Sequence, residues 1–386
     1  MNRNIKLLTW FNFFTDFKLY APVAIIYFSQ VSGSFALGMA IFSIAMVSSA
    51  LFEIPTGIFS DMIGRKKTVI LGAISAVLYV VFYALGTSFI FLAIGALFEG
   101  LSRSFYSGNN DALLHDSLSS EKQEHLYEKY LGRINAMFQI ALAISAVLGG
   151  VIAYWSFPLV IWLSVIPQII CLVLASKIIE PRVPIIESGN VYKHLAEAFS
   201  LFVKNRKLRI LGGANAIGFG FGEVGYEFQS AFYQTVWPVW AIGIAKSLSN
   251  IGATISFYYS GRIIKKYNAP WILFIGSLYN RAAGTIAVLF PSPISPLLMS
   301  STSLTYGVAT VAENGLMQKE FTQKQRATMS SLNSFIGNIF FGIIAVIIGF
   351  FADKLSPAIA LLIVQAGLLP MHWLYWKLFK HEKENV

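Results

Sequence analysis

Charged residues are scarce in this sequence. Only 12% of the 386 residues are Asp, Glu, Lys or Arg, whereas 56% are hydrophobic. A soluble domain carries roughly 25% charged residues, so the deficit is too large for a surface that faces water. The composition excludes an ordinary soluble globular domain and predicts a membrane protein.

Other residues and motifs that the sequence lacks exclude several kinds of site. The single cysteine, Cys171, excludes a disulfide within the chain. The dipeptide Gly-Lys never occurs, so there is no phosphate-binding loop and transport driven by ATP hydrolysis in this chain is not expected. The five histidines are scattered without metal-ligand spacing, and we expect neither a metal nor another cofactor.

Long apolar runs fill most of the chain. A spanning helix needs about 20 residues, and the 15% aromatic content suits a protein with two interfacial belts. The first run is interrupted by Asp16 and Lys18 and has no cleavage site after it, which favours a spanning helix over a signal peptide. The sequence predicts an all-α membrane protein with spans near 5–30, 36–59, 68–86, 89–113, 131–154, 157–178, 208–234, 238–262, 270–290, 296–318, 328–352 and 356–379.

The net charge of +10 is distributed unevenly. Nearly all lysines and arginines outside the predicted spans fall on one side, together with both termini. Positive charge marks the cytoplasmic face, so we expect both termini in the cytoplasm of a multi-pass protein of the cytoplasmic membrane. The basic residues then face anionic lipid, and no nucleic-acid partner is implied.

The longest polar stretch divides the predicted spans into two sets of six. The predicted organisation is a bundle at 1–180, a cytoplasmic linker at 181–207 and a second bundle at 208–386. Within the linker, apolar and basic residues alternate at helical spacing, which predicts an amphipathic helix on the membrane surface. Two six-helix halves suggest a repeat architecture.

A Gly-rich, basic motif follows the second predicted span. It reads Gly57-Ile-Phe-Ser-Asp61-Met-Ile-Gly64-Arg65-Lys66-Lys67. The glycines allow a tight turn and close helix approach, and Asp61 can cap a helix or accept hydrogen bonds from arginine. The second half has a weaker counterpart after its own second span, in which Gly261 matches Gly57 and Asn268 matches Gly64. We expect both Gly57 and Gly261 to open loops.

This motif resembles the signature G-x-x-x-D-x-x-G-R-[RK]-x of the major facilitator superfamily, and every fixed position is met. The resemblance implies a fold of twelve helices in two pseudo-symmetric halves. It also implies a gate in which Asp61 faces Arg326 and Arg65 reaches Asp111 or Asp116. The plainer interpretation is a loop with surface ion pairs, each worth under about 1 kcal/mol. The motif pattern G-x-x-x-G-P of drug–proton antiporters is absent from the fifth span.

Ionisable residues within membrane spans are costly and usually functional. The resemblance implies that the first, fourth, seventh and tenth helices line a central cavity. Six charged residues lie on these helices, and with Glu53 of the second span they form our predicted substrate and proton cavity: Asp16, Glu99, Arg103, Glu223, Glu227 and Glu313.

Two pairs of these residues are four positions apart and share a helix face. Glu99 and Arg103 either neutralise each other or contact substrate. Glu223 and Glu227 cannot both stay ionised cheaply in a low dielectric, so they suit proton coupling unless both face a wet vestibule. Asp16 is the other candidate for proton coupling, and Lys18 is expected to pair with a neighbouring helix.

The resemblance implies a monomeric secondary active transporter that moves a small solute by alternating access, coupled to protons and surrounded by membrane lipids. Buried acids outnumber buried bases, which tilts the solute toward a cation. One alternative is a facilitator of the same fold. Another is a membrane transferase that uses N-D-x-x-D clusters, but Asn110-Asp111 is followed by Asp116, five rather than three residues later. A relative that no longer transports is a third.

Overall fold

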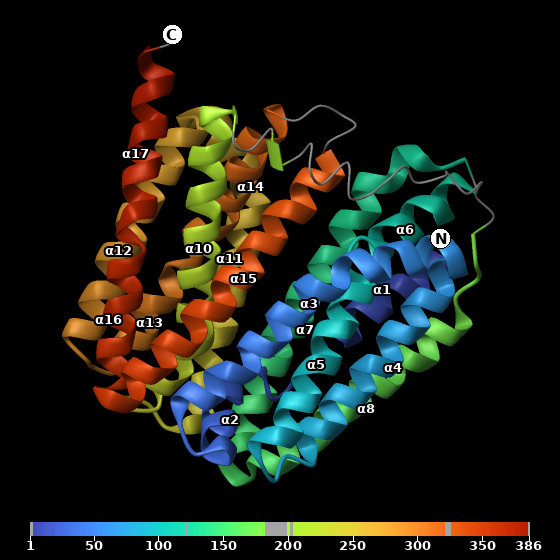
Figure 1. The fold of residues 1–386 in the computed structure, drawn as a ribbon, viewed down its shortest axis with the longest axis horizontal. Coiled ribbons are helices and arrows are strands. Elements are labelled where there is room, and N and C mark those ends of the chain that lie inside the picture. The colour runs from blue at the N-terminus through green and yellow to red at the C-terminus, as the bar shows by residue number, and fades with distance from the viewer. Residues whose placement is uncertain (1–2, 121, 182–198, 201–203, 321–325, 385–386) are drawn as a thin grey trace. The chain divides into compact units, whose positions relative to one another are not determined.

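The computed structural model describes residues 3–120, 122–181, 199–200, 204–320 and 326–384, and within these residues the regular structure is entirely helical. Each helix is labelled in Figure 1 where there is room. The helices are α1 (Arg3–Thr15), η1 (Ala21–Val23), α2 (Ala24–Ser32), α3 (Phe35–Ile63), α4 (Arg65–Ala84), α5 (Phe89–Tyr106), α6 (Asn109–Ser119), η2 (Glu124–Leu126), α7 (Tyr127–Trp155), α8 (Phe157–Lys177), α10 (Arg206–Tyr233), α11 (Val239–Tyr267), α12 (Ala269–Leu289), α13 (Ser295–Ser301), α14 (Ser303–Lys319), α15 (Arg326–Lys354), α16 (Pro357–Gly367) and α17 (Leu369–Glu384).

Every predicted span coincides with one helix or with consecutive helices. Within the described residues, eight helical segments are long and apolar enough to cross a membrane. Four predicted spans do not reach this length and hydropathy, namely 5–30, 208–234, 238–262 and 296–318. They either break or carry many polar residues, so their deficit in hydropathy reflects polar side chains set within a helical bundle.

Several spans that were predicted as continuous helices are interrupted in the structure. The first predicted span is broken between α1 and η1, where residues 16–20 are not helical. The fourth, tenth and twelfth predicted spans are also interrupted, near Ser107, Thr302 and Leu368. Apolar periodicity does not reveal such breaks, because a broken span is as apolar as a continuous one.

The prediction that Gly57 and Gly261 open loops is also wrong. Gly57 lies within α3 and Gly261 lies within α11, so neither opens a loop. An apolar run marks the length buried in lipid, and a helix continues past it wherever polar residues suit water. The actual turn after α3 is at Gly64.

The chain divides into two compact units. The first comprises residues 1–186 with 238–247, and the second comprises 187–237 with 248–386. The first turns of α11 therefore group with the first unit, which differs from the predicted boundary at 208. The predicted linker helix falls mostly on 182–198 and 201–203, which lie outside the described residues.

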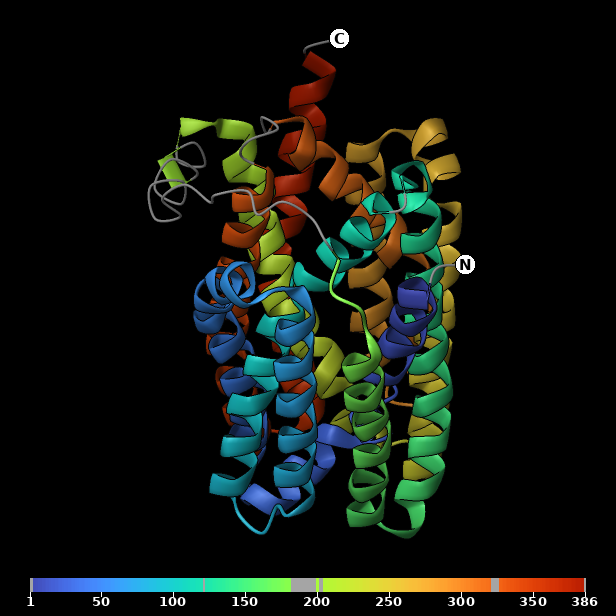
Figure 2. The same cartoon turned by 90° about the vertical axis from the view of Figure 1, so that its right-hand side faces the viewer.

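In the first unit, α1 packs on α7 and α8, α5 packs on α3 and α4, and α4 packs on α8. The blue-to-green helices in Figures 1 and 2 run alongside one another in this way. Asn4 at the start of the chain bonds Ile179 after α8, and Arg65 at the start of α4 bonds Glu180. The amino terminus, the turn after α3 and the residues after α8 therefore meet at one end of the unit. An up-and-down bundle requires this, because α3 and α8 are its second and sixth spans.

The second unit repeats this arrangement. Helix α10 packs on α15, α16 and α17, while α12 packs on α14, α16 and α17. The repeat extends to backbone conformation, because Gly64 and Asn268 precede α4 and α12 with positive φ values of 95° and 54°. Few residues other than glycine adopt positive φ, and asparagine is among those that do most readily. The predicted correspondence between these two residues is therefore reflected in their geometry.

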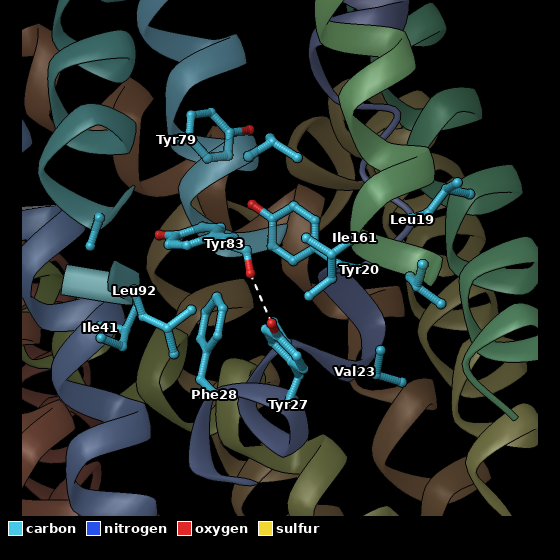
Figure 3. Packing of buried hydrophobic residues seen from close by; sticks show 14 of the residues in the cluster. Leu19, Tyr20, Val23, Tyr27, Phe28, Ile41, Tyr79, Tyr83, Leu92 and Ile161 are labelled. Atoms are coloured by element: carbon cyan, nitrogen blue, oxygen red, sulfur yellow. Dashed lines mark hydrogen bonds between the residues drawn. The ribbon is translucent and has the colours of Figure 1, made fainter. Parts of the chain in front are cut away.

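The core of the first unit is rich in tyrosine. Figure 3 shows Tyr20, Tyr27, Tyr79 and Tyr83 packed with aliphatic side chains, and Tyr27 donates a 2.8 Å hydrogen bond to the Tyr83 carbonyl oxygen. Tyr83 is fully buried. A buried tyrosine usually finds a polar partner for its hydroxyl, so this core has polar groups at its centre.

Close helix contact at Gly100 gives a stability test. A Cβ at Gly100 in α5 would lie 2.6 Å from the Ala45 carbonyl oxygen and 2.7 Å from the Ser49 nitrogen of α3. Because backbone atoms cannot rotate away, Gly100→Ala should destabilise the protein by about 1–3 kcal/mol. Thermal unfolding in detergent measures the change. Gly132→Ala is the matched control, since a Cβ there has nothing within 4 Å, and an equal loss in both variants would contradict this account.

Candidate functional site

The break in the first spanning segment exposes backbone groups inside the first unit. Helix α1 ends at Thr15, and its last carbonyl groups lack intrahelical partners. The side-chain amide of Gln168 in α8 donates to the carbonyl oxygens of Phe14 and Thr15, at 3.3 and 3.4 Å. The Phe14 carbonyl oxygen also accepts the Phe17 N–H at 3.3 Å, so the turn and the neighbouring helix together satisfy the carbonyl groups at the break.

A cavity of about 280 Å³ lies at this break. Its walls come from α1 and the break, α4, α5, the turn into α6, and α8. The lining residues are Asn12, Thr15, Asp16, Lys18, Ala76, Tyr79, Glu99, Ser102, Arg103, Tyr106, Ser107, Asn110 and Gln168. Three of the predicted cavity residues, Asp16, Glu99 and Arg103, thus share one site.

The carboxylate of Glu99 is the electrostatic centre of this cavity. Arg103 donates to Glu99 Oε1 from Nη2 at 2.8 Å and from Nε at 3.2 Å, and Lys18 Nζ lies 3.6 Å from the same oxygen. The Tyr83 hydroxyl donates to Oε2 at 2.8 Å. Both oxygens of Glu99 are engaged, so this residue holds Lys18 and Arg103 in place.

Lys18 gains a second favourable contact from the broken helix. It lies just past the carboxyl end of α1, where the helix dipole favours a positive charge. Its ammonium group also lies 5.5 Å from the ring centroid of Tyr79. The expectation that Lys18 pairs with a neighbouring helix agrees with its ion pair to Glu99 in α5.

Other polar atoms of the cavity lack partners. Among the described residues, the buried oxygens Asn110 Oδ1 and Gln168 Oε1 have no hydrogen-bond partner. Buried polar groups normally find one, so these acceptors suit water or the donors of a polar solute. The Asp16 side chain likewise has no hydrogen bond or ion pair within 4 Å in the described part of the chain. It is the cavity acid that is not committed to a structural contact.

The signature motif lies at one end of the same unit. Arg65 donates from Nη1 to Ser60 Oγ at 3.0 Å, and its Nε lies 3.7 Å from Asp116 Oδ2. Of the two acids expected near Arg65, the structure therefore places Asp116 within reach, whereas Asp111 is exposed at the start of α6. The side chains of Asp61 and Arg326 lie outside the described residues.

Glu180 was missed by the sequence analysis. Its two carboxylate oxygens accept the backbone N–H groups of Arg65 and Lys66, at 2.7 and 2.8 Å. This contact satisfies the first turn of α4 and places a negative charge at its positive end. The available signal was an acid just after the sixth span, on the same side as the motif.

The predicted acids of the second unit occupy separate places. Glu223 and Glu227 are half-buried on one face of α10, and Glu223 is close to Tyr306 of α14. Glu313 lies near Asn215 and Tyr375, and Asn215 accepts a 2.6 Å hydrogen bond from Asn333. In the first unit, Glu53 Oε1 accepts a 3.5 Å bond from Ser107. Glu223, Glu227 and Glu313 belong to the second unit, whereas Ser107, the partner of Glu53, lines the same cavity as Asp16.

Comparison with known proteins decides the family. Residues 7–346 match the model of the Major Facilitator Superfamily. The chain belongs to this superfamily. It is a multi-pass membrane protein of the transporter type, as the motif in the turn before α4 predicted.

Solved structures of other transporters share the fold at low sequence identity. A crystal structure of a point mutant of the nucleoside transporter NupG is 14% identical, with a TM-score of 0.82 over 97% of this chain and 100% of that one. An auto-inhibited peptide transporter of the POT family is 10% identical, with a TM-score of 0.76 over 97% and 96%. These likenesses concern the fold alone.

A curated relative is an uncharacterized transporter, BU466, from Buchnera aphidicola. It is 32% identical over 139 residues, which cover 36% of this chain. The match spans about a third of that relative's length.

The Glu99 cluster gives a second stability test. Glu99→Gln would leave Lys18 and Arg103 partly buried without their anion, and breaking such a pair costs about 3 kcal/mol. We expect a lower thermal midpoint in detergent. Asp111→Asn neutralises an acid on the surface of α6. This control should change the free energy of unfolding by no more than about 0.5 kcal/mol. Equal midpoints for Glu99→Gln and the parent would show that the cluster does not stabilise the unit.

Proposed function

We propose that this protein is a secondary active transporter that moves a small solute across the cytoplasmic membrane by alternating access, coupled to protons. The observation that carries the proposal is the break at residues 16–20, which presents Asp16 and Lys18 to a polar cavity. Transporters commonly build their binding sites from discontinuous spanning helices, where freed backbone groups and charges meet at the midplane.

The cavity residues divide into two roles. Glu99 is bound by Arg103, Lys18 and Tyr83, so its role is to position the two cations. The solute then contacts the outer surfaces of these cations, together with the unpartnered oxygens of Asn110 and Gln168. Because the lining holds two acids and two bases, this cavity favours neither sign of solute, and the cationic solute expected from sequence stays a prediction.

Asp16 is our proposed proton-coupling group. A carboxyl group that lines a cavity without a fixed partner can take up and release a proton as access alternates. Glu223 and Glu227 in α10 remain further candidates, since the proposal requires only one titrating acid. A facilitator of the same fold remains the alternative.

The proposed orientation follows the positive-inside rule. The basic end of the first unit, which holds the amino terminus and the Arg65 turn, faces the cytoplasm, and so does the carboxyl terminus. In this orientation the Arg65–Asp116 contact belongs to a cytoplasmic gate that also includes Asp61 and Arg326. We propose that the transporter acts as a monomer.

Neutralising the coupling acid should separate two activities. After a thermal-shift screen identifies a solute that raises the unfolding temperature, Asp16→Asn, Glu223→Gln and Glu227→Gln are tested in proteoliposomes. We expect Asp16→Asn to abolish accumulation driven by a proton gradient yet retain solute exchange, because exchange needs no net proton movement.

The controls distinguish the outcomes. If all three variants accumulate solute like the parent, the proposed proton site is wrong. If collapse of the proton gradient leaves uptake by the parent unchanged, the protein is a facilitator or uses another ion. Asn12→Ala, which removes an uncharged lining residue, should alter solute affinity without uncoupling the proton.

Loss of the gate contacts should reduce transport without unfolding the protein. Asp61→Asn and Arg65→Ala would remove the proposed charge-assisted contacts of the gate, each worth about 1.5–3 kcal/mol, and should shift the protein roughly tenfold or more toward inward-facing forms. Initial rates in proteoliposomes measure the loss. Lys67→Ala, an exposed charge in the same turn, is the control. Parent-like rates in both gate variants would contradict the role.

A further inference from the structure

A second cavity lies in the second unit, away from the proposed solute site. It has a volume of about 250 Å³ and is formed where the start of α10 packs on α17. Its lining residues are Arg206, Arg209, Ile210, Leu374 and Lys377. Three cationic side chains and two aliphatic ones therefore face the same space, and none of the described residues that line it is acidic.

The spacing of these residues explains their convergence. Arg206, Arg209 and Ile210 are three and four positions apart in α10 and share one face. Leu374 and Lys377 are three apart in α17 and share another. Glu320, an acid near this end of α10, contacts Lys207 at 3.2 Å and Asn205 at 3.1 Å. It is not among the residues that line the cavity.

Aromatic residues place this cavity at the level of a membrane interface. Trp373 and Trp376 of α17 are about half exposed, and tryptophan favours the boundary between headgroups and acyl chains. Lys377 Nζ lies 3.5 Å from the Trp373 ring centroid, and Lys380 Nζ lies 5.8 Å from that of Trp376. The apolar segment 357–380 ends at the same level.

We propose that this cavity binds the phosphodiester headgroup of an anionic phospholipid. Arginine presents a planar fork of donors that matches phosphate oxygens, and lysine adds a compact charge. Ile210 and Leu374 form an apolar wall against which the first carbons of the acyl chains pack. Basic pockets between spanning helices on the cytoplasmic side have the chemistry to bind such headgroups.

A lipid fits this site better than a soluble phosphate. The cavity has both cationic and aliphatic walls, and a free phosphate would leave the aliphatic wall unused. The bound lipid would join the start of α10 to α17 by bridging their cations. It would therefore stabilise the second unit, independently of any solute in the first.

Lipid-dependent stability tests the proposal. The full-length protein in a neutral detergent is titrated with phosphatidylglycerol, phosphatidylcholine or glycerol 3-phosphate, while thermal unfolding and retained lipid in native mass spectrometry are measured. We expect phosphatidylglycerol alone to raise the midpoint and to remain bound. In Arg206→Gln/Arg209→Gln/Lys377→Gln the apparent affinity should fall roughly 100-fold, from about fivefold per basic residue.

Two further variants make the test specific. Arg262→Gln/Lys265→Gln/Lys266→Gln removes three exposed cations from the last turns of α11 and should bind phosphatidylglycerol like the parent. Single Lys377→Gln should weaken binding about fivefold even if the triple variant is unstable. Equal weakening in the α11 variant, equal stabilisation by phosphatidylcholine, or stabilisation by glycerol 3-phosphate at the same concentrations would overturn the lipid assignment.

Discussion

Lipid offers no hydrogen bonds to a protein backbone, and this constraint shapes the proposed site. A break in a spanning helix leaves carbonyl and N–H groups that cost several kcal/mol each unless protein or water satisfies them. Here the break after Thr15 is tolerated because Gln168 bonds the carbonyl groups of Phe14 and Thr15. The same break positions Asp16 and Lys18 beside the cavity, so the site exists because α8 stabilises a discontinuity in the first span.

Charge compensation is the second requirement. Two cations line the cavity at a depth where isolated charges are costly, and Glu99 offsets both. Because Tyr83 occupies its other oxygen, Glu99 cannot move toward a solute without losing several contacts. A rigid anion that holds two cations leaves Asp16 as the adaptable acid, so structural and chemical roles are separated among neighbouring carboxylates.

The sequence predicted the architecture better than the site. Each predicted span falls on helical residues, because burial in lipid leaves a strong compositional signal, and the motif identified the family. The break at residues 16–20 was not predicted, since it depends on Gln168, about 150 residues away in the chain. Asp16, Glu99 and Arg103 line one cavity, and their role in substrate or proton binding stays a prediction. Glu223, Glu227 and Glu313 were grouped with them by helix number, and Glu53 as an acid within a span. Their place in one common cavity stays a prediction.

The third span of each unit, α4 in the first and α12 in the second, begins with a different kind of cap. In the second unit, Asn268 adopts positive φ and its own side chain accepts the Trp271 N–H at 3.2 Å. In the first, Gly64 has no side chain, and the distant Glu180 accepts the N–H groups of Arg65 and Lys66 instead. The cap of α12 is therefore local, whereas the cap of α4 depends on the residues that follow α8. A Cβ at residue 64 would lie 2.9 Å from the Glu180 carboxylate oxygen, so a larger residue there would require the Glu180 side chain to shift. The motif's second glycine thus lies where the signature turn meets the start of the segment that joins the two halves.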